Sequence, residues 1–263
     1  MGWLENFNHD LRGTPNGPKL VFLHGLMGSW TNWRKILPTF EGRYQILSFD
    51  QRGHGKSFKP PSGYHPKDFA DDLWRILGDL GWSQIDLVGH SMGGRNAVVF
   101  ASQHPGRVRK LVVEDIGPEG TPENVANIER IFAKVPTPFA DKRVAKETIL
   151  GAFEDQVLAN YLYSNITEVE PGVHDWRFSR EGILQAVRAG RGEDFWHEWN
   201  TLRMPTLLIR GANSDELSHE IYKKMLLQNH LARGVEIPNA GHWVHFDQAQ
   251  EFARVVEKFL SET

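Results

Sequence analysis

Short apolar runs alternate with segments of helical spacing along most of the chain. Most runs span four or five residues rich in Val, Leu, Ile and Phe, and the helical segment Pro66–Leu80 lies between the second and third. The strand candidates are Lys19–Leu23, Gln45–Phe49, Ile85–Val88, Lys110–Val113, Thr206–Ile209 and Gly234–Ile237. This alternation is typical of βαβ units, in which helices connect parallel strands. We therefore predict an α/β fold with a mostly parallel central sheet flanked by helices.

A long stretch without a strand candidate separates the fourth run from the fifth. It extends from about Gly117 to Arg203, which is too long for a loop inside a compact domain. Helical spacing recurs in it over Pro122–Lys134, Lys142–Tyr163 and Arg180–Trp199. We expect residues 118–203 to form a helical cap, or lid, over the end of the sheet, with residues 1–117 and 204–263 as the core domain.

The polar residues that follow the predicted strands are the first place to look for a site. In an open α/β sheet, ligands bind outside the carboxyl ends of the strands. Those positions hold His24–Gly25, Asp50, Gly89–Ser91, Asp115 and Gly211–Asp215. The search for chemistry therefore begins at these loops.

The motif Gly89–Gly93 reads Gly-His-Ser-Met-Gly and fits the pattern G-x-S-x-G. It directly follows an apolar strand and leads into the helix-compatible segment Gly94–Ser102, which is the context of a nucleophile elbow. In an elbow, a strained serine presents its hydroxyl above the sheet, and the helix N-terminus behind it favours developing negative charge. We therefore predict that Ser91 is a nucleophile; an ordinary glycine-rich turn is the alternative.

The loop His24–Gly28 follows the first predicted strand. In a serine hydrolase this loop supplies one N–H group of the oxyanion hole, and the residue after the nucleophile supplies the other. The expected donors are the backbone amides of Leu26 and Met92. Taken alone, the segment also reads as a plain turn.

The loop Asp50–Ser57 looks at first like a phosphate-binding loop, because its last residues are Gly-Lys-Ser after a strand. That pattern requires glycine where Asp50 stands, and the dinucleotide pattern beginning at Gly53 has Phe58 at its third glycine position. We interpret the loop as structural support for the elbow and predict no nucleotide site.

A candidate general base lies in Pro238–His245, ahead of a C-terminal helix predicted over Gln248–Leu260. His242 follows Gly241 at the apex of this loop and can reach the strand ends. His245 is expected to pack or to lie in the next helical turn. The two histidines lack the glutamate of an H-E-x-x-H zinc pair, so we predict no metal site.

A serine–histidine pair needs a carboxylate that orients the imidazole and stabilises its protonated form. Asp115 ends one predicted strand, and Asp215 lies in the segment Arg210–Asp215 after another. Either aspartate could equally cap a helix or fix a loop, as is common after a strand. The residues alone leave both open as the acid.

Together these residues resemble the α/β-hydrolase superfamily over nearly the whole chain. The matching motifs, in the family's chain order, are His24-Gly25, Asp50-x-Arg52-Gly53-x-Gly55-x-Ser57, Gly89–Gly93 and Gly241-His242. Further segments are similar to a small carboxylesterase branch that includes bacterial short-chain esterases and mitochondrial hydrolase-domain proteins. They are Asp115–Pro118, Gly211–Ser214 and Asn239–His245.

The resemblance implies an α/β-hydrolase fold with a helical cap inserted after the strand that the family counts as its sixth. The commonest family pattern places the acid where this chain has Ser214. In the esterase branch the implied acid follows strand six and matches Asp115, with Ser214 assisting. The aspartate at position 215, directly after Ser214, is a departure from the pattern of that branch, so Asp215 stays an alternative to Asp115 as the acid. Dehalogenases and epoxide hydrolases of this fold use an aspartate nucleophile, whereas carbon–carbon hydrolases of ring-cleavage products keep serine and have a loop similar to Gly241–Trp243.

Composition narrows the choice of partners. The chain of 263 residues has 30 Lys+Arg and 33 Asp+Glu, a net charge of −3, which lacks the basic excess expected for binding nucleic acid. It has no cysteine, which excludes disulfides, thiolate metal sites and a thiol nucleophile. No apolar run approaches the roughly 18 residues of a membrane span, and no signal peptide is visible. We expect a cytoplasmic protein; the sequence does not indicate its oligomeric state.

These observations lead to the hypothesis of a serine carboxylesterase that acts on small-molecule esters without a cofactor. Ser91 attacks the carbonyl, His242 moves the proton, and Asp115 or Asp215 orients His242. The residues expected to line an apolar pocket are Met27, Trp30, Trp176, Phe195, Trp196, Trp199 and Trp243. Phe195 and Trp199 also have the spacing of a core stripe. The alternatives are a carbon–carbon bond hydrolase with the same triad and a non-catalytic ligand receptor on the same fold.

Overall fold

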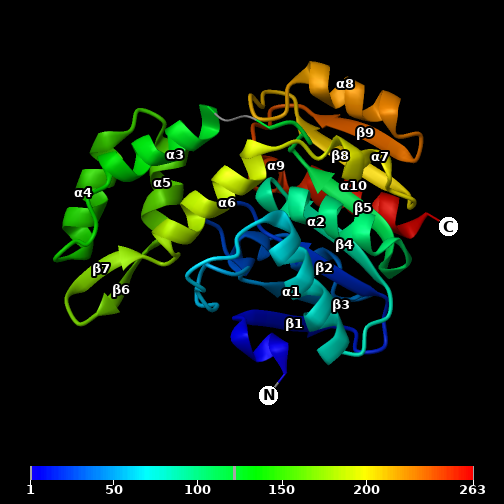
Figure 1. The fold of residues 1–263 in the computed structure, drawn as a ribbon, viewed down its shortest axis with the longest axis horizontal. Helices are drawn as coiled ribbons and strands as arrows, with labels where there is room; N and C mark the ends of the chain where they lie inside the picture. Colours follow the sequence, from blue (N-terminus) through cyan, green and yellow to red (C-terminus); the bar gives the residue numbers. More distant parts are fainter. Residues whose placement is uncertain (1, 121–122, 263) are drawn as a thin grey trace.

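The computed structural model, which describes residues 2–120 and 123–262, is built on a seven-stranded sheet (Figure 1). The strand order is β1-β3-β2-β4-β5-β8-β9. The strands are β1 (His9–Gly13), β2 (Lys19–Leu23), β3 (Gln45–Phe49), β4 (Ile85–His90), β5 (Val108–Glu114), β8 (Thr206–Gly211) and β9 (Ala232–Ile237). β1 pairs antiparallel with β3, and the other neighbours in the described sheet pair in parallel. The predicted α/β architecture is confirmed.

The parallel strands coincide with apolar runs because both faces of the sheet are covered. Every residue of β4 and of β8 is buried. β1 differs, because it lies at the edge and its residues alternate between half-buried and exposed positions. Its sequence, His-Asp-Leu-Arg-Gly, contains one apolar residue, Leu11. The β1 segment therefore contains no apolar run, and this strand was not predicted from the sequence.

Two hydrophobic cores lie on opposite faces of the sheet. Successive residues of a strand point to opposite faces, so Val21 and Leu23 enter one core while Leu20 and Phe22 enter the other. The first core is covered by α1 (Pro66–Asp79), α2 (Met92–Gln103), α7 (Trp196–Asn200) and α8 (His219–Gln228). The second is covered by α9 (Val244–Asp247), α10 (Ala249–Ser261), η2 (Trp30–Trp33) and η3 (Leu37–Thr39). The other 3₁₀ helices are η1 (Trp3–Asn6) and η4 (Pro105–Arg107).

Most of the chain between β5 and β8, apart from α7, forms a separate group of elements at one end of the sheet (Figure 1). They are α3 (Glu123–Lys134), α4 (Lys142–Ala152), α5 (Gln156–Ser164), β6 (Ile166–Glu170), β7 (Val173–Trp176) and α6 (Arg180–Gly192). Their apolar side chains, including Phe132, Ile149 and Leu162, form a third cluster that also contains Met27 from the loop after β2. The insertion thus packs on itself and touches the sheet's loops.

Several details of the insertion differ from the sequence prediction. The predicted start of the first helix, Pro122, lies outside the described residues. The segment Lys142–Tyr163 is divided into α4 and α5, because Asp155 caps a new helix by accepting hydrogen bonds from the amides of Val157 and Leu158. β6 and β7 form an antiparallel hairpin that was not predicted. As far as the described residues extend, no helix is long and apolar enough to cross a membrane.

Candidate active site

Ser91 lies at the sharp turn between β4 and α2. Its backbone has φ 52° and ψ −122°, a conformation that side-chain-bearing residues rarely adopt. The flanking glycines make room for the turn. A Cβ on Gly93 would lie 2.4 Å from the carbonyl oxygen of Leu23, and a Cβ on Gly89 would lie 2.4 Å from that of Gly93. This is the strand–turn–helix geometry that the motif predicted.

Three side chains from distant parts of the chain meet at this turn. The Ser91 hydroxyl lies 3.0 Å from Nε2 of His242, which belongs to the loop between β9 and α9. Nδ1 of His242 donates to Oδ2 of Asp115, just after β5, at 2.8 Å. Ser91 and Asp115 are buried, and the His242 side chain is 22% exposed. The arrangement is a continuous chain from a hydroxyl through an imidazole to a carboxylate.

The structure distinguishes the two candidate acids. Asp115 accepts a hydrogen bond from the amide of Gly211 at 3.0 Å through Oδ1, and one from the Ser214 hydroxyl at 2.5 Å through Oδ2. Ser214 therefore contacts the acid itself. Asp215 is exposed and, among the described residues, is not a hydrogen-bond partner of His242. Asp115, and not Asp215, holds the imidazole.

The imidazole of His242 is held in a site that favours its protonated form. Burial alone would lower the pKa of His242, but the hydrogen bond that its Nδ1 donates to Asp115 and the negative charge of that carboxylate outweigh it. The pKa of His242 is therefore raised above the ordinary histidine value of 6.5. A base with this pKa accepts a proton readily near neutral pH.

The expected oxyanion donors lie beside Ser91. Met92 is the first residue of α2, where a backbone N–H has no partner within the helix, and Leu26 follows β2 in the same cavity wall. Tyr161 of α5 fixes the loop that carries Leu26, because its hydroxyl donates to the Leu26 carbonyl at 2.6 Å. His24 supports the same loop, and its Nε2 accepts from the amide of Gln51 at 2.9 Å. Burial lowers the pKa of His24 to about 4, so the ring stays neutral.

The Asp50–Ser57 loop is held together by its own aspartate. One oxygen of Asp50 accepts from the amide of Trp30 at 2.8 Å, and the other accepts from the amide of Lys56 at 2.9 Å. The next residue, Gln51, links the loop to the elbow helix α2 through its side-chain amide. Its Nε2 donates to the His24 carbonyl, and its Oε1 accepts from Nδ2 of Asn96. These contacts agree with the interpretation of the loop as support for the elbow.

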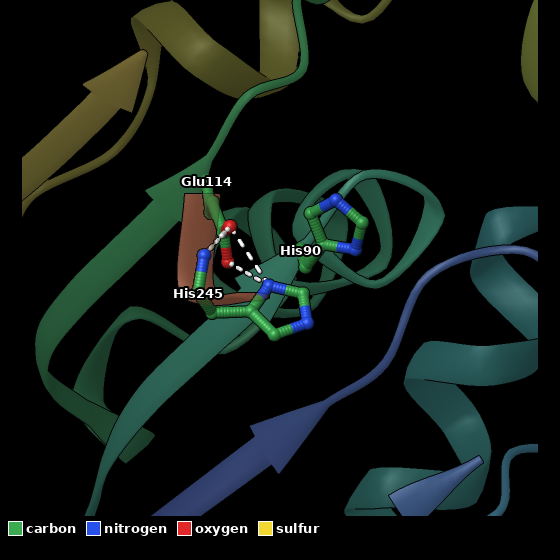
Figure 2. Close-up of side chains that lie close together, drawn as sticks. All are labelled: His90, Glu114 and His245. Carbon is green, nitrogen blue, oxygen red and sulfur yellow. Dashed lines mark hydrogen bonds and ion pairs between the residues drawn. The ribbon is translucent and has the colours of Figure 1, made fainter. Parts of the chain in front are cut away.

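A second buried group of side chains, drawn in Figure 2, adjoins the first, with the ring centroids of His90 and His242 4.7 Å apart. Its members are His90, Glu114 and His245. Glu114 accepts hydrogen bonds from the backbone N–H of His245 at 2.9 Å and from its Nδ1 at 2.8 Å. Nε2 of His90 donates to the carbonyl of His242 at 3.0 Å. Sequence reasoning missed Glu114 and His90, although each directly precedes a residue it had selected.

This second group fixes the loop that carries the base. Its possible ligand atoms lie within 4.8 Å of one another, close enough to raise the question of a metal. However, the Glu114 carboxylate already accepts from His245, and His90 already bonds the loop backbone. Burial raises the pKa of Glu114 to about 7 and lowers that of His245 to about 3. The contacts are those of a hydrogen-bonded anchor for the His242 loop.

A cavity of about 220 Å³ opens over Ser91 and His242. Met27 and Trp243 line it, as expected. The insertion shares the apolar wall with the core domain, and the sequence analysis did not identify the residues that it contributes. These wall residues are Ile128, Ile131, Leu158, Tyr161, Ala186 and Val187. The cavity therefore lies between the strand ends and the insertion.

The other aromatic residues expected in the pocket lie elsewhere, and this expectation is corrected. Trp176 stacks on Phe178 inside the insertion, with ring centroids 4.9 Å apart. Trp199 is fully buried in the first sheet core, as is Phe195, and Trp196 packs against that core. Trp30 is not among the lining residues either. Helical spacing indicated a core position for Phe195 and Trp199 without indicating which core they enter.

Comparisons with known proteins agree with this architecture. The chain matches the family model described as alpha/beta hydrolase fold over residues 18–249. It is 31% identical over 260 residues to the Mus musculus protein named sn-1-specific diacylglycerol lipase ABHD11, covering 95% of this chain and 83% of that protein. It is 26% identical over 254 residues to 2-(acetamidomethylene)succinate hydrolase from Mesorhizobium japonicum, covering 95% and 91%. A solved marine microorganism esterase superposes with a TM-score of 0.86 at 27% identity, covering 96% of this chain and 98% of that one.

Proposed function

Because this chain belongs to the α/β-hydrolase family, we propose that it is a serine hydrolase that cleaves small carboxylic esters. Relatives named as an esterase and a lipase support hydrolase activity. The observation that carries the proposal is the hydrogen-bonded chain Ser91–His242–Asp115, with contacts of 3.0 and 2.8 Å, at the floor of a cavity.

In the proposed mechanism, the Ser91 oxygen attacks the ester carbonyl while Nε2 of His242 takes its proton. The carbonyl oxygen becomes an oxyanion that the N–H groups of Leu26 and Met92 stabilise, and Asp115 stabilises the imidazolium. His242 then protonates the departing alcohol, which leaves an acyl group on Ser91. Water, deprotonated by His242, attacks the acyl group, and the acid leaves as Ser91 regains its proton.

The insertion would act as a lid in this scheme. Residues 118–203 would form the lid domain, and residues 1–117 and 204–263 would form the domain that carries the triad. The lid lines the acyl cavity with Ile131, Leu158 and Val187, while the nucleophile, base and acid all follow sheet strands. Substrate choice would therefore reside in the lid and bond cleavage in the sheet.

Steady hydrolysis of p-nitrophenyl acetate and p-nitrophenyl butyrate tests the proposal. We expect repeated turnover by the unaltered protein and loss of at least about 10³-fold in kcat for Ser91→Ala, which removes the nucleophile. Ser102→Ala, at the far end of the same helix, is the matched control and should retain activity. Absence of turnover in the unaltered protein would favour the ligand receptor instead.

A carbon–carbon bond hydrolase is the second candidate. The observation that favours it is the position of Trp243, which lines the cavity beside His242 with ring centroids 5.5 Å apart and offers an aromatic face to a conjugated substrate. A dienoate ring-cleavage product should accompany the esters in the assay. A kcat/KM for the dienoate well above that for every ester would replace the esterase proposal with this one.

A further inference from the structure

One wall of the cavity is charged, although the rest of its lining is largely apolar. The charged residues are Arg95, Arg191 and Glu216. Arg95 lies on α2 four residues after Ser91, and both residues line the cavity. Arg191 comes from the last turn of α6, and Glu216 comes from the segment after β8. Three separate elements thus bring charge to the same end of the cavity.

Two of these charges neutralise each other. Arg191 and Glu216 form an ion pair whose side chains are 14% and 21% exposed. Burial alone would raise the pKa of Glu216, but the neighbouring cation of Arg191 outweighs it and the pKa of Glu216 is lowered. The glutamate therefore stays ionised, and the pair contributes no net charge to the cavity.

Arg95 forms no ion pair of this kind, although the charge of Glu216 acts on it and its Cζ lies 5.6 Å from the ring centroid of Phe195. It is only 5% exposed, and no carboxylate of the described residues forms an ion pair with it. Its Nη2 donates to the backbone carbonyls of Gly117 at 3.1 Å and Glu119 at 3.5 Å. Its Nε is buried with no hydrogen-bond partner, and its Nη1 lies beside Gly190, another residue of the cavity wall. Of its donors, Nη1 thus lies at the cavity wall, and no acceptor among the described residues is assigned to it.

A buried cation without a partner is costly. Burial and the like charge of Arg191 outweigh the opposite charge of Glu216 and lower the pKa of Arg95 to about 9, so the guanidinium is still charged at neutral pH. A bound anion would supply both the missing charge and the missing acceptors, and the planar guanidinium suits a carboxylate.

We propose that the substrate carries a free carboxylate that binds Arg95 while its ester carbonyl lies at Ser91. This inference rests on the proposed esterase function and names its substrate class. Ser91 and Arg95 line one cavity of about 220 Å³, which limits the length of the acyl chain between them. Hemi-esters of short dicarboxylic acids, with acyl chains of about five carbons, are therefore suitable probes.

The first test compares monoethyl glutarate with ethyl pentanoate, which has the same acyl length but no carboxylate. Acid release by the unaltered protein is followed in a pH-stat. We expect kcat/KM for the hemi-ester to exceed that for the neutral ester by at least about tenfold, the usual size of charge-assisted hydrogen bonding. Equal rates, or a preference for ethyl pentanoate, would overturn the proposal without any variant.

The second test locates the carboxylate site. Arg95→Met should lower the ratio of the two kcat/KM values by about tenfold to a hundredfold. The matched control is Arg188→Met, which removes a cation from α6 at a position 53% exposed and paired with Glu129 outside the cavity. The control should keep the ratio of the unaltered protein. A folded Arg95→Met protein with an unchanged ratio would show that the carboxylate binds elsewhere.

Calorimetric titration of glutarate into Ser91→Ala protein separates this inference from the esterase proposal, because binding requires no catalysis. Binding that is lost when Arg95→Met is added to Ser91→Ala supports the carboxylate site even if neither ester is hydrolysed. Hydrolysis of ethyl pentanoate by the unaltered protein together with no glutarate binding would support the esterase and overturn the carboxylate site.

Discussion

At the scale of single residues, the proposed chemistry depends on how one buried carboxylate is held. Asp115 accepts hydrogen bonds from the Gly211 amide, the Ser214 hydroxyl and Nδ1 of His242. These three donors, from the end of β8, the loop after it and the loop before α9, fix the orientation of its oxygens. The imidazole is in turn held with Nε2 toward Ser91.

Asp115→Asn should therefore reduce activity far more than Asp215→Asn. An asparagine keeps the shape of the side chain but stabilises the wrong tautomer of His242, a change that lowers kcat by about 10⁴-fold in a serine protease. Asp215 is exposed, so its replacement should change kcat by less than about threefold. Steady-state kinetics on p-nitrophenyl butyrate measures both. The reverse ranking would place the acid in the loop after β8.

The pH profile should report the state of His242. Its pKa is raised above 6.5, so the protonated form persists to higher pH and the base is available only above that pKa. We expect kcat/KM to be low in acid and to rise through a midpoint above about 6.5. Asp115→Asn should move that midpoint downward, because the charge that raises the pKa is gone. A profile that stays flat from about pH 5 to about pH 8 would contradict the role of His242 as base.

At the scale of elements, the insertion between β5 and β8 supplies part of the apolar wall of the cavity. Its strands and helices were only partly predictable. The helices have a clear apolar spacing, but β6 and β7 mix apolar and charged residues, as in Ile-Thr-Glu-Val-Glu. Val169 is 50% exposed, so this hairpin buries too little to produce a strand pattern. The turn signal was present, since Pro171 precedes Gly172 with φ 75°.

Shortening one wall residue should change the preferred acyl length. Leu158 of α5 lines the cavity, and Leu158→Ala would lengthen the space available to the acyl chain. We expect the ratio of kcat/KM for p-nitrophenyl hexanoate to that for the butyrate to rise by about tenfold. The neighbouring Val157 is 52% exposed and outside the lining, so Val157→Ala serves as the control. If Leu158→Ala leaves the hexanoate-to-butyrate ratio of kcat/KM unchanged, the lid does not determine the preferred acyl length.

At the scale of the whole molecule, the parallel sheet brings distant residues together. Ser91, Asp115 and His242 follow β4, β5 and β9, whose carboxyl ends share one edge of the sheet. That is why motifs far apart in the sequence predicted both the fold and the residues that meet. The sequence could not show which core each tryptophan enters, or that Arg95 would remain unpaired, because both depend on how the insertion packs against the sheet.

Trp199 illustrates the difference between a core and a pocket. It is fully buried, and its Nε1 donates to the Met225 carbonyl at 2.9 Å. Trp199→Ala should lower the free energy of unfolding by about 3–5 kcal/mol, as expected for loss of a large core side chain. Trp74→Ala, at a residue 43% exposed, should cost less than about 1 kcal/mol. Urea unfolding measures both. A small decrease in the free energy of unfolding for Trp199→Ala, accompanied by altered ester selectivity, would show that Trp199 contacts the substrate and is not part of the core.

The most direct test of the central claim is covalent labelling with a fluorophosphonate probe followed by peptide mapping. The probe reacts with an activated serine and needs no knowledge of the natural substrate. We predict one label per chain on the peptide that contains Ser91, no label in Ser91→Ala, and a full label in Ser102→Ala. Labelling that survives in Ser91→Ala, or a label on a different residue, would contradict the assignment of Ser91 as nucleophile.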